Sequence, residues 1–349
     1  MAATYKDIQR ITGLSLATIS KYYNGGTVLE HNRVAIESAA NDLGFRVNEF
    51  ARSLRSGRSQ TVGVLLPELN NDFHLNIIVG VEAALRDSGV GVVVCSSRQG
   101  GSGGDAVDFL IGRRVDGIIA VPSAHDASAL ADAAGRGLPL VVVDRMIDGL
   151  ECDAVVLDNA RASADVVDHL VQHGHHDIAL ICGTNDVWTM QQRRSGFRAA
   201  MRRARRRMPR HMTVTGPLTV EAGYRGMQRL LAAENPPTAV YCANYELTVG
   251  ALIAVNESGV SVPADLSFVG FDSLELARAS KPRLSMLVQP VRDIAAAAAT
   301  LVNARFGGRD GRPPLPPQTV VLPGKLVPGE SVASPRHSAH PVPLEGQPC

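Results

Sequence analysis

Short apolar runs alternate with alanine-rich amphipathic stretches from Thr61 almost to the end of the chain. The runs, which we predict to be strands, are Val62–Leu66, Val90–Cys95, Gly117–Val121, Leu140–Val143, Ala154–Leu157, Ile178–Cys182, Ala239–Ala243, Phe268–Phe271, Met286–Val288 and Thr319–Leu322. The amphipathic stretches, which we predict to be helices, lie near residues 76–88, 105–113, 126–136, 159–173, 190–206, 220–234, 245–258 and 290–306. Such alternation is typical of βαβ units around buried parallel sheets. Because so many strands exceed one comfortable sheet, the pattern predicts two doubly wound lobes.

The first 58 residues have helical spacing and no strand-like apolar run. A first helix is predicted over Lys6–Thr12, ended by Gly13, which can take a left-handed turn. Ser15 is a suitable N-cap for a second helix over 16–23, and a third helix is predicted over about 31–43. The apolar residues at helical spacing are Ile8, Ile11, Ile19, Tyr23, Ile36, Ala40 and Leu43. Three short helices with a glycine in the first turn indicate a helix-turn-helix.

The second helix of such a motif lies in the major groove of DNA. Leu16, Ala17 and Lys21 remain on its outward face, where Lys21 can reach a guanine and the apolar pair can contact a thymine methyl. The short polar side chains that can donate to phosphates are Ser15, Thr18, Ser20 and Asn24. From the residues alone, the alternative is a generic three-helix cap with a solvated polar face.

Positive charge is concentrated in this small unit. Residues 1–58 hold eight Lys and Arg against five Asp and Glu, whereas the whole chain of 349 residues has a net charge of only +1. DNA binding must therefore come from a local patch, because the molecule as a whole is not a polycation. The five cysteines lie far apart and form no C-x-x-C, which argues against a disulfide framework and a zinc site. We expect no metal and no cofactor.

Targeting and tail segments follow from composition. The N-terminus lacks the apolar stretch of a signal peptide, and no run approaches the roughly 20 apolar residues that span a bilayer. We therefore expect a cytoplasmic protein associated with the nucleoid. The tail over 334–349 is rich in Pro, His, Ser and Gly without apolar periodicity, so we predict that it is disordered.

Three further motifs carry weaker signals. The arginines of 202–210 are compatible with a second nucleic-acid patch, although a solvated helix end is the commoner meaning of such a run. His175 and His176 are adjacent, so their side chains point in different directions, and a loop is a simpler explanation than a metal site. The glycines of 100–104 lack the lysine of a P-loop and the spacing of a dinucleotide loop, so we predict a flexible loop.

Residues 4–58 carry a series of spaced motifs: Lys6-Asp7-Ile8, Gly13-Leu14-Ser15, Ala17-Thr18-Ile19-Ser20-Lys21, Asn24-Gly25, Leu43-Gly44-Phe45 and Asn48-Glu49-Phe50-Ala51-Arg52-Ser53-Leu54. Together they resemble the headpiece of the lactose-repressor (LacI/GalR) family of transcriptional regulators. The resemblance implies that the last stretch is a hinge helix whose Leu54 wedges between base pairs in the minor groove and bends the duplex. An ordinary linker is the alternative. The resemblance also implies DNA contacts by Lys6, Asn48, Ala51 and Arg52. Departures from the family pattern are Val47, Tyr22-Tyr23 and Leu29.

Landmarks of the same family continue to about Val332: Asn71-Asp72-Phe73, Gly80, Glu82, Val143-Asp144-Arg145, Asp158-Asn159, His169-Leu170, Gly174-His175, Arg193-Arg194-Ser195-Gly196-Phe197, Asn244, Val269-Gly270-Phe271-Asp272 and Val288-Gln289-Pro290. Their order resembles the family's effector-binding body. The resemblance implies the two-lobed fold of periplasmic sugar-binding proteins, with strands that cross between the lobes.

The resemblance also implies which side chains meet an effector in the cleft between the lobes: Phe73, Asp144, Trp188, Arg193, Asn244 and Asp272. Arg193 would span two hydroxyls or pair with a carboxylate, and the aspartates would accept from hydroxyls. Two alternatives stay open, because Asp272 could be only a helix cap and Trp188 could belong to the core. His74 and Tyr245 replace the family's usual second aromatic residue and aspartate, which leaves the effector unidentified.

The predicted architecture is an all-α helix-turn-helix head followed by a two-lobed α/β body built like a periplasmic binding protein around doubly wound parallel sheets. The predicted boundaries are 1–46 for the head, 47–60 for the hinge helix and linker, 61–333 for the body, and 334–349 for the tail. Within the body we expect one lobe from 61–158 and 288–318 and the other from 159–287 and 319–333.

The sequence thus predicts a DNA-binding transcriptional regulator, a repressor, whose operator affinity is controlled by a sugar-type effector. We expect a homodimer, or a tetramer, on a near-palindromic operator, with effector binding changing the angle between the lobes and so the spacing of the hinge helices. The alternatives are a sugar-binding protein without DNA activity and a two-lobed sugar-modifying enzyme. The enzyme is disfavoured because the sequence shows no nucleophile elbow, metal-ligand spacing or paired catalytic carboxylates.

Overall fold

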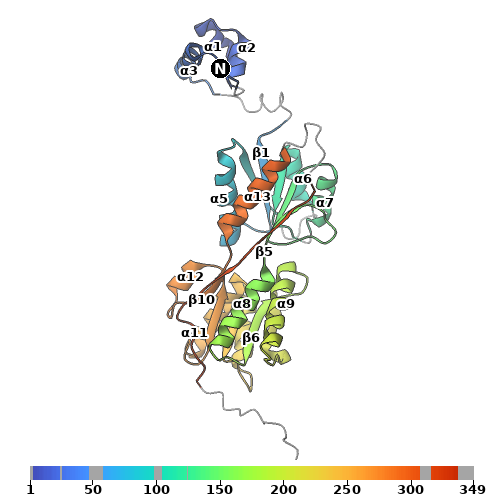
Figure 1. Cartoon of the computed structure of the whole chain (residues 1–349), viewed down its shortest axis with the longest axis vertical. Helices are drawn as coiled ribbons and strands as arrows, with labels where there is room; N and C mark the ends of the chain where they lie inside the picture. The colour runs from blue at the N-terminus through green and yellow to red at the C-terminus, as the bar shows by residue number, and fades with distance from the viewer. Residues whose placement is uncertain are drawn as a thin grey trace, which may run out of the picture. The chain divides into compact units, whose positions relative to one another are not determined.

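The computed structural model describes residues 3–23, 26–46, 58–97, 104–123, 125–306 and 316–336. The chain divides into two compact units, Met1–Gln60 and Thr61–Cys349, which we call the head and the body (Figure 1).

The described residues of the head form three helices: α1 (Tyr5–Thr12), α2 (Leu16–Tyr23) and α3 (Glu30–Asp42). One isoleucine from each helix, Ile8, Ile19 and Ile36, is fully buried in a shared core. Burial of such a side chain stabilises the folded state by about 1.5–3 kcal/mol. Gly13 ends α1 in the left-handed conformation with φ of 69°, as the sequence predicts.

The first lobe of the body contains a six-stranded parallel sheet in the order β11-β5-β4-β3-β1-β2. Its strands are β1 (Thr61–Leu66), β2 (Gly91–Ser96), β3 (Gly117–Ala120), β4 (Leu140–Val143), β5 (Asp153–Leu157) and β11 (Thr319–Leu322). The helices on one face are α5 (Asp72–Arg86) and α13 (Val291–Phe306), and those on the other are α6 (Asp105–Gly112) and α7 (Ala127–Gly135).

The second lobe contains a six-stranded sheet in the order β12-β10-β9-β8-β6-β7, in which only β12 runs antiparallel among the described strands. Its strands are β6 (Ile178–Gly183), β7 (Thr213–Gly216), β8 (Ala239–Cys242), β9 (Ser267–Phe271), β10 (Ser285–Val288) and β12 (Lys325–Val327). Its helices are α8 (Asn159–Gln172), α9 (Trp188–Arg203), the 3-10 turn η1 (Arg210–Met212), α10 (Val220–Leu231), α11 (Tyr245–Ser258) and α12 (Leu274–Ala279).

Close packing of helix pairs needs glycine at two places in the second lobe. A Cβ on Gly196 of α9 would lie 2.0 Å from the carbonyl oxygen of Ala160 in α8, and a Cβ on Gly250 of α11 would lie 1.9 Å from that of Val220 in α10. Any larger residue would force these helices apart, so both positions help to fix the faces of the second sheet.

The chain crosses between the lobes after β5, after β10 and between β11 and β12. The predicted two doubly wound lobes are confirmed. The structure differs from the predicted boundary within residues 319–333, because Thr319–Leu322 pairs with β5 in the first sheet and only Lys325–Val327 joins the second. The sequence pattern did not predict β7, β12 or α12, since these are short elements with few buried residues.

Candidate functional site

The outward face of α2 is exposed at the positions that the helix-turn-helix pattern predicts. Ser15, Leu16, Ala17 and Lys21 are exposed, and we call these four residues the recognition surface. Leu16 is 38% exposed, whereas Ile19 on the opposite face is fully buried. The exposed leucine is available to a partner, because it does not contribute to the core of the head.

Ser15 has the capping role that the sequence predicts. Its Oγ accepts from the backbone N–H of Thr18 at 3.1 Å and lies 2.9 Å from the Thr18 hydroxyl. Thr18 and Ser20 are partly buried, and Lys6 is exposed on α1. The other predicted DNA contacts lie outside the described residues: Asn24, Asn48, Ala51, Arg52 and Leu54. The hinge helix therefore stays a prediction.

An aromatic layer fixes α2 against the rest of the head. Tyr5 and Tyr23 stack with ring centroids 5.4 Å apart, and Phe45 packs against both rings. The Tyr22 hydroxyl donates to Glu37 Oε1 at 2.7 Å, and this bond, together with Arg33, holds the pKa of Glu37 below its usual value. The unusual tyrosine pair thus joins α2 to α3, whose N-cap residue Leu29 offers no side-chain hydrogen bond.

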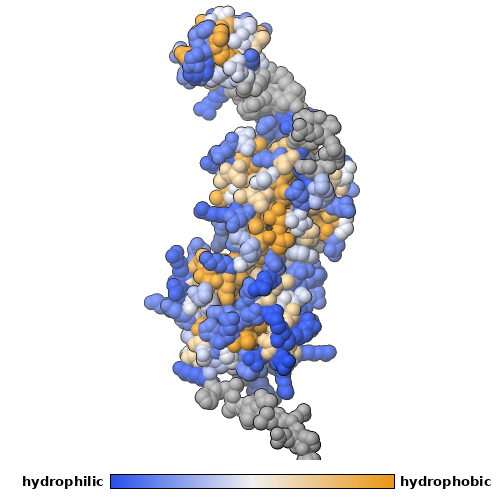
Figure 2. Space-filling view, in the orientation of Figure 1, coloured by the Kyte–Doolittle hydropathy of each residue, from blue (hydrophilic) through white to orange (hydrophobic). Residues whose placement is uncertain are grey.

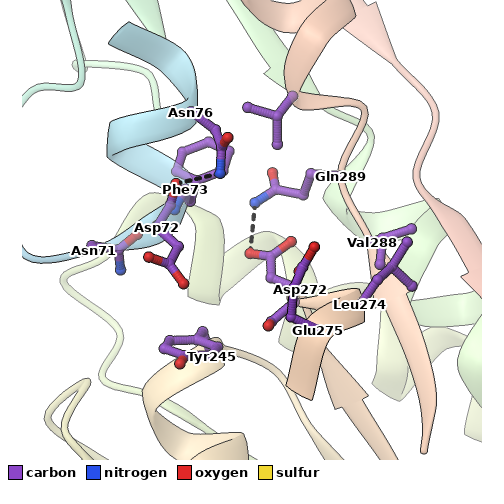
Figure 3. A pocket seen from close by; sticks show the side chains of 12 residues that line it. Asn71, Asp72, Phe73, Asn76, Tyr245, Asp272, Leu274, Glu275, Val288 and Gln289 are labelled. Atoms are coloured by element: carbon purple, nitrogen blue, oxygen red, sulfur yellow. Dashed lines mark hydrogen bonds between the residues drawn. The ribbon is translucent and has the colours of Figure 1, made fainter. Parts of the chain in front are cut away.

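A pocket of about 290 Å³ lies between the two lobes of the body (Figure 3). Its lining residues come from both lobes: Asn71, Asp72, Phe73, Asn76, Tyr245, Asp272, Ser273, Leu274, Glu275, Val288, Gln289 and Val291. Most of them follow the carboxyl ends of β9 and β10 or begin α5, α11, α12 and α13. Ligands in open α/β sheets bind at this position.

The backbone is strained at this edge of both sheets. Asp144 follows β4 with φ of 71°, and Asp272 and Ser273 follow β9 with φ of 58° and 49°. Left-handed conformations are uncommon for residues other than glycine, and they cluster at ligand sites. Ser273, not Asp272, caps α12, since its Oγ accepts from the N–H of Leu276 at 3.1 Å.

Arg193 of α9 is buried close to Asp272 but does not line the pocket. Its side chain is buried, and its guanidinium donates through Nε to Asn159 Oδ1 and through Nη1 to the carbonyl of Ala243, both at 2.7 Å. The guanidinium carbon also lies 3.7 Å from the ring centroid of Phe271. Burial lowers the pKa of Arg193, and Asp144 opposes this effect most, followed by Tyr241 and Asp272.

Asp272 presents a carboxyl group with altered acidity to the pocket. Burial raises its pKa to about 6, and the charge of Arg193 and a hydrogen bond from Gln289 offset only part of this. The Gln289 amide nitrogen donates to Asp272 Oδ2 at 3.1 Å, while its Oε1 is buried without a partner among the described residues (Figure 3).

The opposite wall of the pocket belongs to the first lobe. Asn71 caps α5 by accepting from the N–H groups of Phe73 and His74, and its Nδ2 donates to Glu246 Oε1 of the second lobe at 2.7 Å. His74 lies behind Phe73, where burial lowers its pKa and its Nδ1 has no partner among the described residues. Tyr245 lies across the pocket from Phe73 (Figure 3).

The structure therefore separates the sequence-predicted effector residues into two groups. Phe73 and Asp272 line the pocket. Asp144 is buried beside Arg145 behind it, and Asn244 caps α11 by accepting from the N–H of Leu247 at 3.1 Å. Trp188 is partly buried at the start of α9 and is not part of the lining.

Comparison with known proteins decides the family. Residues 167–332 match the model of the periplasmic binding protein-like domain. The HTH-type transcriptional repressor CytR of Escherichia coli (strain K12) is 30% identical over 310 residues, which cover 88% of this chain and 91% of the relative. The chain belongs to the LacI/GalR family of transcriptional regulators. It is a DNA-binding regulator with an effector-binding body.

Two solved structures of transcriptional regulators share the fold. The transcriptional regulator CelR in complex with cellobiose is 26% identical, with a TM-score of 0.72, and the match covers 94% of this chain and 99% of that one. The Lac repressor dimer bound to operator and the anti-inducer ONPF is 24% identical, with a TM-score of 0.81, and the match covers 95% and 100%. At that identity, the second likeness shows the fold alone.

Several lining residues of this LacI/GalR regulator were not among the predicted contacts. They are Asn71, Asp72, Asn76, Tyr245, Ser273, Leu274, Glu275, Val288, Gln289 and Val291. The position of Gln289 in the sequence could have indicated a place in the site, because it directly follows a buried strand, as Asp272 does. Asp72 and Glu275 stand in the first turns of two helices from different lobes, and their proximity depends on the way the lobes meet.

Two of the three weaker motifs have structural explanations, while residues 100–103 of the glycine-rich stretch lie outside the described residues. Arg202 and Arg203 end α9, and Arg203 pairs with Asp168 at 2.7 Å. His175 is buried between the hydroxyls of Thr238 and Ser267, each 2.9 Å from a ring nitrogen. The described residues contain no group of three or more His, Cys, Asp or Glu placed to hold a metal ion. None of the helices that the structure describes combines the length and apolar character that a membrane span needs.

Proposed function

We propose that this LacI/GalR regulator is a homodimeric repressor whose operator affinity is controlled by a sugar held in the pocket between the lobes. The single observation that carries the proposal is the composition of that pocket, in which residues of both lobes face one cavity. A ligand that contacts both walls favours one arrangement of the lobes over another, because it binds that arrangement more tightly.

The pocket chemistry suits a sugar. Phe73 and Tyr245 supply aromatic surface for a ring, and Asp272, Asp72 and Glu275 supply carboxylate oxygens for hydroxyls. A volume of about 290 Å³ is at the small end of ligand pockets and matches a compact ligand. The complex of the related CelR with cellobiose supports the same ligand class.

The buried residues behind the pocket position its contact groups. Arg193 is anchored to α8 through Asn159 and to the end of β8 through Ala243. Its charge stabilises the ionised form of Asp272, and Asp144 shares that charge. We assign Arg193, Asp144 and Asn244 to holding the geometry of the site, and Phe73 and Asp272 to direct contact with the effector. Trp188 would contact the effector only in an arrangement in which the lobes lie closer together.

The dimer is supported by an apolar stripe on α5. Leu75 and Val79 are 41% and 65% exposed, and Ala83 continues the same side of the helix. Apolar side chains gather on the face of the first lobe around α13, while hydrophilic ones cover the α9 edge of the second lobe (Figure 2). A second copy of the chain would remove such a stripe from water.

On DNA we propose one head per half-site of a near-palindrome. Lys21 and Leu16 would contact base edges, Ser15 the phosphates, and Leu54 the minor groove. The protein would act by binding alone, without catalysis, and in the cytoplasm, where it meets the chromosome.

The proposal is tested by measuring the affinity of the full chain for its operator in the presence of neutral sugars. The operator is first recovered from a random duplex pool, and binding is then followed by fluorescence anisotropy at fixed salt. We expect at least one of ribose, glucose, galactose and cellobiose to change the operator Kd tenfold or more. An operator Kd that none of these sugars changes would contradict sugar control. Val79→Asp should also lower both dimer content and operator affinity, whereas Val220→Asp, the same change at an exposed valine of the second lobe, should leave both unchanged.

A further inference from the structure

The pocket is lined by acids from both lobes. Asp72 begins α5 in the first lobe, and Asp272 and Glu275 follow β9 in the second. Figure 3 shows Asp72 on one side of the cavity and the other two carboxylates on the opposite side. Among the described residues that line the cavity, none is Lys, Arg or His. A ligand therefore meets negative charge on both walls.

Helix N-termini do not reverse this charge. Helices α5, α11, α12 and α13 begin at the pocket, and free N–H groups there would attract an anion. The chain caps three of these helices itself, since Asn71, Asn244 and Ser273 each accept from N–H groups of the first turn. Asp72 and Glu275 place carboxylates in the first turns of α5 and α12, so the N-termini of these two helices already have negative charge beside them.

The nearby guanidinium groups are also occupied. Arg193 is buried and donates to Asn159 and to Ala243, and the charges of Asp144 and Asp272 both favour its protonated form. Arg145 pairs with Asp144 at 3.1 Å. Neither arginine is part of the pocket lining, so an incoming phosphate or carboxylate finds no cation on the walls that the structure describes.

The pocket instead has a surplus of hydrogen-bond acceptors. The amide nitrogens of Asn71, Asn76 and Gln289 all donate within the protein, to Glu246, to the carbonyl of Asp72 and to Asp272. Because Asp272 takes the Gln289 nitrogen, the amide oxygen faces away and remains buried without a donor among the described residues. Ligand hydroxyls can donate to such groups, whereas phosphate and carboxylate oxygens cannot.

We propose that the effector carries no anionic group, and that Asp72 and Glu275 are specificity-determining residues that exclude sugar phosphates and uronates. The inference rests on the proposed sugar pocket and adds that the sugar it binds is uncharged. Two carboxylates close to a ligand anion repel it, and no cation on the described walls compensates, so discrimination of at least tenfold between matched ligands follows.

The test uses matched pairs of probes with the full chain. Each neutral sugar is compared with an anionic counterpart: glucose with glucose 6-phosphate and glucuronate, galactose with galacturonate, and ribose with ribose 5-phosphate. Dissociation constants come from calorimetry at fixed ionic strength, and thermal midpoints give a second readout. The variant is Asp72→Asn/Glu275→Gln. Its control, Asp132→Asn/Glu234→Gln, makes the same chemical changes at exposed residues outside the pocket.

We expect a neutral sugar to bind and its anionic counterpart to bind at least tenfold more weakly. The pocket double variant should lower the ratio of these two dissociation constants at least threefold, and the control variant should leave the ratio unchanged. A counterpart that binds the unaltered protein as tightly as the neutral sugar, or a ratio that the double variant leaves unchanged, overturns the inference and leaves the sugar pocket standing. If no sugar of either kind binds, the proposed sugar effector fails, and this inference fails with it.

Discussion

The side-chain amide of Asn71 donates a hydrogen bond to Glu246 Oε1 at 2.7 Å and so joins the start of α5 in the first lobe to the start of α11 in the second. Asn71 also caps α5, which fixes the position of its side chain. Glu246 raises the pKa of Glu68, although burial is the larger cause. The contact between the lobes is therefore both a hydrogen bond and a source of repulsion between two carboxylates.

Removing the acceptor should change how the lobes associate. We expect Glu246→Ala to weaken effector binding about fivefold, because one hydrogen bond to a charged group contributes on the order of 1 kcal/mol at a partly exposed site. Calorimetry with the bound sugar and small-angle scattering of the free protein measure the two effects. Glu246→Gln keeps an acceptor, so its effector affinity should lie nearer to that of the unaltered protein. Glu234→Ala, at an exposed position, should have the same affinity as the unaltered protein. Equal affinities for all four proteins would contradict the role of this contact.

Arg193 should be important for stability. Replacing it by methionine leaves Asn159 Oδ1 and the Ala243 carbonyl without their donor and removes the charge that offsets the burial of Asp272. We expect Arg193→Met to lower the free energy of unfolding of the body by about 3–5 kcal/mol, as when one partner of a buried pair is removed. Thermal and urea unfolding measure this loss. Arg202→Met, at an exposed position of the same helix, should cost less than about 0.5 kcal/mol, and equal losses for the two variants would contradict the assigned role.

Two apolar residues of α2 should respond in opposite ways. Ile19 is fully buried, so Ile19→Ala should destabilise the head by about 2–4 kcal/mol and abolish DNA binding through unfolding. Leu16 is 38% exposed, so Leu16→Ala should leave the head folded and change the base preference instead. Circular dichroism of the full chain, combined with binding to a set of single-base operator variants, separates the two outcomes. A folded Leu16→Ala protein with unaltered preference would remove Leu16 from the recognition surface.

Acidification should destabilise the body through His175. Burial lowers the pKa of this histidine to about 4, below the ordinary value of 6.5, so the folded protein excludes a proton that the unfolded chain binds between these values. The free energy of unfolding therefore falls as the pH is lowered from 6.5 towards 4, by on the order of 3 kcal/mol from this group. Asp272, with its pKa raised to about 6, contributes an opposite slope in part of this range.

Comparison of variants isolates the histidine from this opposing group. His175→Gln has no titratable ring, so its stability should fall less steeply between pH 6.5 and 4 than that of the unaltered protein. His211→Gln, at an exposed position, should keep the original slope. Parallel curves for His175→Gln and the unaltered protein would show that this histidine is not the sensitive group.

The fold was largely predictable because its long strands are almost continuously apolar and lie between amphipathic helices. The strand β6, for example, is buried at every position. The strand β7 escaped prediction because only Val214 of its four residues is buried, and α12 because it is a six-residue helix. Periodicity carries little information about such short or edge elements.

The candidate site was predictable only in part, for a geometric reason. Asp272 and Gln289 follow buried strands, and strand ends are where open α/β sheets place ligands. Asp72 and Glu275 belong to helices of different lobes, and no local pattern indicates that they share a cavity. Nor does local sequence indicate that Arg193 is buried and bonded behind the pocket, since both its acceptors lie far along the chain.

The most direct test of the central claim is the selection of bound duplexes from a random pool by the purified full chain, with Lys21→Ala analysed in parallel. The account predicts that the unaltered protein enriches a near-palindrome with two equal half-sites, and that Lys21→Ala relaxes the preference at one base pair in each half. A recovered pool without any consensus, at ordinary ionic strength and with or without neutral sugars, would contradict it.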